Sequence, residues 1–560
     1  MPSMPRTASW IAMVFVLAVN GQAASGTEPT FSELVEVDVV NVEVHVVDKK
    51  GSPVTDLDVG EFKVFEDGQP VAISHFSLVG RTHVNPSTKG LSNPTATSSS
   101  GQQADLITGN QVESQPLWLV VYIDNLNIRP FDRQRSLRAL GRFLEENLGS
   151  DAQVMLVSFD RSIRVHQSFT RDAESIAKAL TEIEATPCYG ARYDDERRDL
   201  LQRIDDLQSP RIAVETFKYL ADSIQHDARR TLDAMERVLG SLSGLPGRKA
   251  LLHVSSGLPA VPAAELFMAV EYKFEIGYGV IRMQEWDMKD DYRLLARSAN
   301  LHGVTIYTLD AAGIRAANSA SVHQVGYKTA KMAGPVDADT GVNLQLPLRQ
   351  LADETGGYAI VNRNDPGPAL QTVAESLRTH YSLGISPDHS GDGEYHTLRV
   401  EVARKGARVH HRSGYIDRSA ETLRSERLQA SLMFSIEDNP LGIDLTIGDV
   451  VESDVDRFIV PLELGIPLDG LVLLDKGAEH RGSLRILIAV MDETGRISEV
   501  VESPLGLSIS DDKLGALMEE RWLYTHRLIL KSGEHTVALG VHDEISGVTT
   551  YLRRTALVGI

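Results

Sequence analysis

The pattern of apolar and polar positions divides the chain into segments of different kinds. From Leu34 to Leu78 apolar and polar residues alternate as in β-strands, and turn signals at 48–51 and 67–68 separate the runs. This pattern predicts a small antiparallel β module over 30–82. Residues 83–115 are rich in Ser, Thr, Asn, Gln and Gly and can bury little apolar surface, so they are predicted to form a flexible linker.

The middle of the chain changes to unbroken apolar runs. Leu117–Ile123 has no polar residue, which is typical of a strand buried on both faces of a parallel sheet. A helical pattern follows it, and similar strands at 154–159, 250–254, 304–309 and 358–361 each lie beside a helical stretch. This alternation predicts an α/β fold, a mostly parallel sheet covered on both faces, with a charged helical insertion at about 190–240. Ligands are then expected at the carboxyl ends of the strands.

The last part of the chain is again rich in strands. Alternating β-branched runs such as Phe458–Leu464 and Leu484–Met491 are separated by turn signals such as Asp492-Glu493-Thr494-Gly495. Residues 425–560 are therefore predicted to form a β-sandwich domain.

The N-terminus has the pattern of a secretory signal peptide. Arg6 precedes an apolar run from Trp10 to Val19, and small residues follow up to Ser25. Residues 1–24 are predicted to be removed on export to the periplasm or the extracellular space, and the apolar run is too short for a stable membrane span. The alternative is a buried N-terminal helix. The single cysteine, Cys188, excludes an intramolecular disulfide and is either a small buried residue, a nucleophile or an intermolecular linker.

Composition restricts the class of partner. The chain of 560 residues has 42% hydrophobic and 24% charged residues, which is ordinary for a folded protein of several domains. Its formal net charge is −21, and no stretch of the sequence concentrates Lys and Arg. Such a surface repels phosphate backbones, so we expect no nucleic-acid partner.

Short motifs in a fixed order give residues 34–417 a resemblance to a known family. They are, in chain order, Val39-Val40-Asn41-Val42, Asp48-Lys49-Lys50-Gly51-Ser52-Pro53-Val54, Glu61-Phe62-Lys63-Val64-Phe65-Glu66-Asp67-Gly68, Asp124-Asn125-Leu126-Asn127, Leu245-Pro246-Gly247-Arg248-Lys249-Ala250-Leu251-Leu252, Leu351-Ala352-Asp353-Glu354-Thr355-Gly356-Gly357, Tyr381-Ser382-Leu383-Gly384-Ile385-Ser386-Pro387 and Arg412-Ser413-Gly414-Tyr415. Together they resemble the von Willebrand factor A domain, and more narrowly the VWFA-related family first named from acidobacteria. The resemblance implies a Rossmann-like von Willebrand factor A domain over 116–417, with its helical insertion and flanking β-sandwich domains.

The resemblance also implies a place for a divalent cation. In A domains generally, an Asp-x-Ser-x-Ser motif after the first strand binds the cation, and a Thr and an Asp from later loops complete the site. Asp124 matches the first position, which makes it the candidate ligand of Mg²⁺ or Ca²⁺. The two Ser positions hold Leu126 and Ile128, whose side chains cannot bind a cation.

The remaining positions match loosely. Thr186 is a stand-in for the Thr, Asn127 lies one residue out of register, and the later Asp falls at Ser255 or Ser256. Too few oxygen ligands remain, so we expect no cofactor to be needed and no effect of a chelator on binding. The alternative role of Asp124 is to cap the helix that follows.

An enzyme is the competing interpretation. His253-Val254-Ser255-Ser256-Gly257 follows a buried strand as a Gly-x-Ser-x-Gly nucleophile motif does, but His replaces the first Gly. Asp310 and His323 are the residues that could complete a triad, and both Ser residues could instead cap a helix. No zinc-protease helix motif, phosphate loop or Cys/His cluster occurs, and the neighbours His410 and His411 would point to opposite faces of a strand.

We therefore predict an exported, non-enzymatic protein of the protein-binding or adhesion type, with a protein partner in the cell envelope or outside the cell. The candidate binding residues are Asp124, Asn127, Thr186, Ser255 and Ser256, and replacing Asp124 with Ala is expected to weaken binding while leaving the fold largely intact. A structural envelope or assembly component is the alternative, and a serine hydrolase is a further one.

Overall fold

The structure is a computed structural model that describes residues 39–49, 51–80, 116–147, 152–315, 330–517 and 521–559. The predicted signal peptide, the predicted linker and His323 lie outside the described residues. The chain divides into two compact units. The larger consists of Glu36–Leu242 and Pro246–Arg418, and the smaller consists mainly of Ser419–Ile560.

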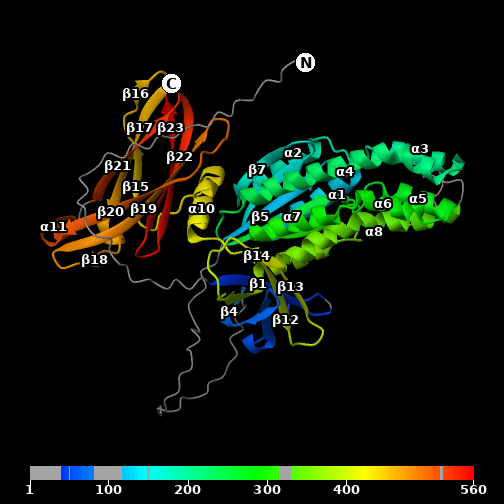
Figure 1. Ribbon diagram of the computed structural model, residues 1–560, viewed down its shortest axis with the longest axis horizontal. Coiled ribbons are helices and arrows are strands. Elements are labelled where there is room, and N and C mark those ends of the chain that lie inside the picture. The colour runs from blue at the N-terminus through cyan, green and yellow to red at the C-terminus, as the bar shows by residue number, and fades with distance from the viewer. Residues whose placement is uncertain are drawn as a thin grey trace, which may run out of the picture. The chain divides into compact units, whose positions relative to one another are not determined.

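A six-stranded sheet of order β10-β9-β8-β5-β6-β7 forms the centre of the larger unit (Figure 1). All neighbouring pairs are parallel except β6 and β7, which are antiparallel. When the six strands are numbered along the chain and the sheet is read from β7 to β10, this is the 3-2-1-4-5-6 strand order of a Rossmann-like sheet. The strands are β5 (Leu117–Asp124), β6 (Ala152–Phe159), β7 (Ile163–Thr170), β8 (Arg248–Ser255), β9 (Val304–Asp310) and β10 (Ala359–Ile360).

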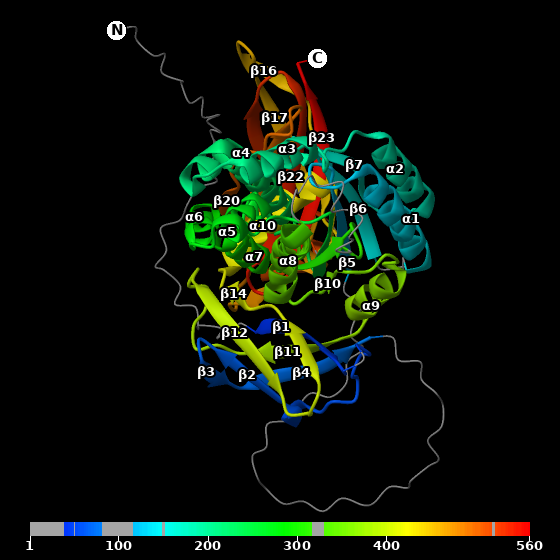
Figure 2. The same ribbon diagram turned by 90° about the vertical axis from the view of Figure 1, so that its right-hand side faces the viewer.

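Helices cover both faces of this sheet (Figure 2). Helices α1 (Pro130–Asn147), α2 (Ala173–Ala185) and α9 (Gly367–Arg378) lie on one face, and α4 (Pro210–Ser241), α7 (Lys289–Leu301) and α8 (Ala330–Thr355) lie on the other. The central strands are buried along nearly their whole length, which accounts for their unbroken apolar sequences. This architecture confirms the predicted α/β fold of the von Willebrand factor A type.

The insertion predicted at about 190–240 is part of a helical layer that extends beyond those bounds and has its own core. Helices α3 (Asp194–Asp206), α4, α5 (Ala264–Phe274) and α6 (Tyr278–Met283) bury one apolar cluster centred on Phe217, Phe267 and Trp286. Ser209 begins α4 by accepting a hydrogen bond from the Ile212 amide, and the residues that α4 buries are apolar apart from Thr231.

Strands from both ends of the larger unit form a small β-sandwich. One sheet has the order β13-β1-β11-β4 and the other β14-β12-β2-β3. The strands are β1 (Val40–Val47), β2 (Phe62–Glu66), β3 (Gln69–Val71), β4 (Ile73–Val79), β11 (His380–Ile385), β12 (Tyr395–Val402), β13 (Arg408–His411) and β14 (Gly414–Ile416). Thus the β module predicted over 30–82 shares one core with strands that the sequence assigned to the α/β domain ending at 417, because β1 pairs with β11 and β2 pairs with β12.

The smaller unit contains two antiparallel sheets that share one apolar core. Its strands are β15 (Asp444–Ile447), β16 (Val451–Asp454), β17 (Arg457–Pro467), β18 (Leu474–Asp475), β19 (Glu479–Asp492), β20 (Val501–Ser510), β21 (Arg521–Leu530), β22 (Gly533–Asp543) and β23 (Thr549–Val558). Helix α10 (Ala420–Phe434) buries Leu428 and Leu432 against β19 and β22, and the short α11 (Asp511–Leu517) follows β20. Across the described residues, no helix combines the length and apolar character needed to cross a membrane.

Candidate functional site

The carboxyl ends of three neighbouring strands bring together the residues that the sequence singled out. Asp124 ends β5, Ser255 ends β8 and Asp310 ends β9. The register pairs Ile123 with Val254 and Ser255 with Asp310, so all three polar side chains lie on one edge of the sheet. The observed topology therefore brings Asp124, Ser255 and Ser256 to the same edge of the sheet, as the sequence predicted.

The Asp124 carboxylate lies inside the protein and accepts hydrogen bonds from three protein donors. It is fully buried. Its Oδ1 accepts from the Asn127 amide at 3.2 Å, and its Oδ2 accepts from Asn127 Nδ2 at 2.8 Å and from Ser255 Oγ at 3.1 Å. Asp124 is therefore a buried, hydrogen-bonded side chain and not an exposed carboxylate at the end of a loop, and buried polar groups of this kind are costly to unpair.

The loop after β5 does not provide a divalent cation with ligands. Leu126 and Ile128 are buried apolar side chains, and both oxygens of Asp124 accept protein hydrogen bonds. The guanidinium of Arg192 donates to the carbonyl of Leu126 and lies 3.5 Å from Asn127 Oδ1, so a protein cation occupies the surroundings of this loop. These residues do not fit the hard-cation site that the resemblance implies.

Thr186 belongs to a different hydrogen-bond network. Its hydroxyl accepts from Asn125 Nδ2 at 3.1 Å and donates to the Ile183 carbonyl at 2.7 Å. The buried Arg133 joins the same network, since it donates to Asn125 Oδ1 at 2.9 Å and to the Thr186 carbonyl at 2.8 Å. The structure therefore ties the Thr186 loop to the β5 loop through Asn125 and Arg133, not through Asp124.

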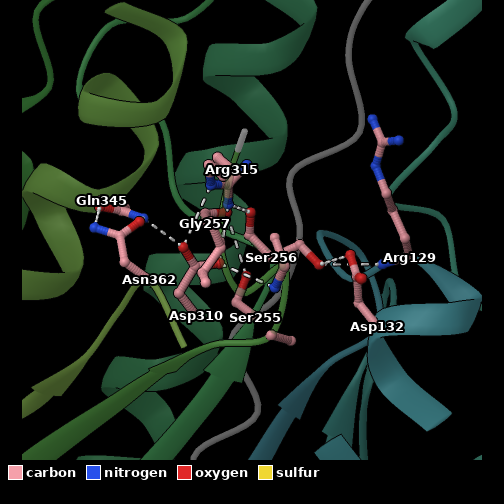
Figure 3. Close-up of polar contacts among 12 residues, drawn as sticks. Arg129, Asp132, Ser255, Ser256, Gly257, Asp310, Arg315, Gln345 and Asn362 are labelled. Carbon is pink, nitrogen blue, oxygen red and sulfur yellow. Dashed lines mark hydrogen bonds and ion pairs between the residues drawn. The ribbon is translucent and has the colours of Figure 1, made fainter. Parts of the chain in front are cut away.

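Ser256 connects the end of β8 to α1 and to the end of β9 (Figure 3). Its hydroxyl donates to Asp132 Oδ2 at 3.0 Å, and its carbonyl accepts from Arg315. Arg315 also pairs with the buried Asp310 at 2.9 Å, and Gln345 Nε2 donates to the same carboxylate at 2.8 Å. The polar groups inside this edge of the sheet are therefore hydrogen-bonded to one another.

Ser255 is not arranged as a catalytic nucleophile. It is fully buried, and its hydroxyl contacts Asp124 Oδ2 and the Gly257 carbonyl at 3.1 and 3.2 Å. A serine nucleophile needs an imidazole base at hydrogen-bond distance, yet both ring nitrogens of the buried His253 lack a hydrogen-bond partner.

Cys188 is half-buried, and burial raises the pKa of its thiol although Arg133 opposes the shift, so little thiolate forms at neutral pH.

The outer rim of this edge is apolar and basic. Phe131 at the start of α1 is 68% exposed, and Ile314 after β9 is 57% exposed. Arg135 reaches both segments, since its guanidinium is 5.8 Å from the Phe131 ring and donates to the carbonyl of Ala311, three residues before Ile314. Arg138 and Arg142 continue along α1 from Arg135, and the three arginines line one shallow hollow together with Asp365.

This basic row is not evident as a charged run in the sequence, because the three arginines are not adjacent in the chain. Their spacing of three and four residues places them on one face of a helix. That spacing beside the leucine pattern was the signal that could have identified the row. We call the surface formed by Phe131, Arg135, Arg138, Arg142 and Ile314 the edge surface.

Comparisons with known proteins add similarities to solved structures. No protein-family profile matches the sequence. No curated protein matches it significantly. The solved structures to which this chain is similar include the vWF domain of the type V pili tip protein Mfa5 from Porphyromonas gingivalis and the conserved hypothetical protein BatB from Bacteroides thetaiotaomicron. They also include an aerotolerance-related membrane protein from Bacteroides fragilis.

Their identities to this chain are 10%, 9% and 10%, and their TM-scores are 0.22, 0.21 and 0.24. The alignments cover 48%, 47% and 47% of this chain and 96%, 97% and 98% of the three structures. The assignment of the fold rests on the strand order and helical layers described above.

Proposed function

We propose that the protein is exported and binds another protein, without catalysis, through the edge surface of its A-like domain. The observation that carries this proposal is the contrast between the interior and the rim of the carboxyl edge. The interior polar groups Asp124, Ser255 and Asp310 are buried and hydrogen-bonded, whereas Phe131 and Ile314 expose large apolar side chains. An exposed aromatic side chain beside arginines is the composition found at protein interfaces.

Charge supports an acidic partner. The whole chain has a formal net charge of −21, so the row of Arg135, Arg138 and Arg142 is a local exception. Complementary charge at an interface mainly raises the association rate and the specificity. Export is supported by the order of Arg6, the apolar run and the small residues at the N-terminus.

Binding through this surface needs no metal. The A-like loop lacks the hydroxyl ligands of the metal-dependent motif, and Asp124 is bonded to Asn127 and Ser255. We therefore propose direct contacts of the partner with Phe131, Ile314 and the arginines, in place of a cation bridging to the partner's carboxylate.

The test is a quantitative pull-down from the envelope and secreted fractions with the purified full chain as bait. Phe131→Asp and Ile314→Asp should each remove the proteins that the wild type retains, because a carboxylate opposes burial at an apolar contact. Leu294→Asp is the matched control, since Leu294 is also a large exposed side chain (64%) but lies on α7. A partner that is retained by both edge variants, or lost equally with the control, would place binding elsewhere.

A further inference from the structure

Two histidines and four carboxylates gather in the small β-sandwich, away from the edge surface. Glu66 ends β2, His396 lies in β12, and His389 lies in the segment that joins β11 to β12. Asp67, Asp392 and Asp417 complete the cluster. Glu66 and Asp417 are buried, and the two imidazole rings stack with their centroids 3.8 Å apart.

A carboxylate holds the Nδ1 atom of each histidine. His389 Nδ1 lies 2.8 Å from Asp417 Oδ2, and His396 Nδ1 lies 2.9 Å from Asp67 Oδ2. A carboxylate at this position keeps a proton on Nδ1, so Nε2 is the nitrogen that can bind a metal ion once it has lost its own proton. Histidines that bind metals have this same arrangement, in which the second nitrogen donates to a carboxylate that orients the ring.

The other nitrogens face further ligand atoms. His389 Nε2 is buried without a hydrogen bond and lies 3.5 Å from Glu66 Oε1. His396 Nε2 lies 3.2 Å from Asp392 Oδ2. One ligand atom from each of Glu66, His389 and His396 lies within 4.8 Å of the other two.

We propose that Glu66, His389 and His396 bind one divalent transition-metal ion of the zinc type, with water as the fourth ligand. Imidazole with carboxylate favours zinc and similar ions, whereas calcium and magnesium prefer oxygen ligands alone. Ligand atoms around a tetrahedral zinc ion are about 3.4 Å apart, so the 3.5 Å from His389 Nε2 to Glu66 Oε1 already matches.

The arrangement also fixes the role of two flanking groups. Tyr415 donates its hydroxyl to Glu66 Oε1 at 2.5 Å and so orients that carboxylate. Asp417 orients His389 through Nδ1 and is a positioning residue. Because Glu66 lies in β2 and His396 in β12, at opposite ends of the unit's sequence, the ion would link the N-terminal strands to the strands after 380.

Binding is tested by isothermal titration with Zn²⁺ and by Co²⁺ absorption on the full chain without a histidine tag, after dialysis against a chelator. The wild type should bind one zinc ion per chain and give visible Co²⁺ bands of a four-coordinate site. The double variant His389→Gln/His396→Gln should bind none. His480→Gln is the control, since His480 also pairs with an aspartate, Asp511 at 3.1 Å, but lies in the smaller unit.

Asp417→Asn provides a second variant in case the double variant does not fold. It keeps all three proposed protein ligands but removes the carboxylate behind His389, and it should weaken zinc binding roughly 10- to 100-fold. Circular dichroism checks the fold of every variant. A wild type that binds no zinc, or zinc binding that His389→Gln/His396→Gln and Asp417→Asn leave unchanged, overturns the proposal.

Discussion

Three donor groups at the end of β5 depend on one carboxylate. If Asp124 is replaced by Ala, the Asn127 amide, Asn127 Nδ2 and Ser255 Oγ lose this acceptor inside the protein. An unsatisfied buried polar group costs about 1–3 kcal/mol, so we expect the free energy of unfolding to fall by at least ~2 kcal/mol. Urea unfolding of the larger unit measures this change.

Asp195→Ala is the control for that substitution. The Asp195 side chain is 94% exposed and pairs with Arg198 on the surface of α3, so its loss should change stability by less than about 1 kcal/mol. Equal stability of the Asp124 and Asp195 variants would contradict the buried network and restore Asp124 as a candidate contact residue.

His396 makes the stability of the small sandwich depend on pH. Burial lowers the pKa of His396, but hydrogen bonds to Asp67 and Asp392 outweigh it and raise that pKa above its ordinary value. The protonated form is thus favoured by folding, so its contribution is complete below pH ~6.5 and is lost as the pH rises through the raised pKa. In metal-free protein, His396→Gln should therefore lower the melting temperature most at pH 5–6 and least at pH 9, as measured by thermal unfolding. A difference that grows with pH would show that the sign is wrong.

At the scale of elements, the turn after β8 can be made only with glycine. Gly257 has φ +113°, and a Cβ there would lie 2.7 Å from Leu344 Cβ on α8. We expect Gly257→Ala to lower the melting temperature clearly more than Gly51→Ala does, because Gly51 also has positive φ but no heavy atom within 4 Å of an added Cβ. The comparison separates steric overlap from backbone strain. Equal effects of the two substitutions would mean that α8 moves away from the added methyl group at little cost in stability.

At the scale of the whole molecule, distant parts of the chain complete each other. β1 lies between β11 and β13, and β2 lies between β12 and β3, so removal of residues up to 115 would expose the edges of three strands, β11, β12 and β13. We expect a chain of residues 116–560 to aggregate, whereas a chain of 36–418 should remain monomeric and fold on its own. Size-exclusion chromatography and circular dichroism check both. A monomeric, folded 116–560 chain would contradict the shared core.

The sequence alone determined the features that depend on local periodicity. The unbroken apolar runs predicted the buried parallel strands, and their alternation with helices predicted the α/β fold and the edge at which Asp124, Ser255 and Ser256 meet. The residue types at Leu126 and Ile128 already showed that the cation motif was incomplete. These conclusions follow from side-chain chemistry and from spacing within a single element.

Only the tertiary structure decided which distant groups meet. The burial of Asp124 depends on donors from Asn127 and Ser255, and the histidine cluster joins Glu66 to residues more than 300 positions away. Pairing between β1 and β11, or between β2 and β12, has no signature in local sequence because the alternating pattern does not identify the partner strand. Periodicity defines each strand and helix, whereas contacts between segments far apart in the chain create the sites.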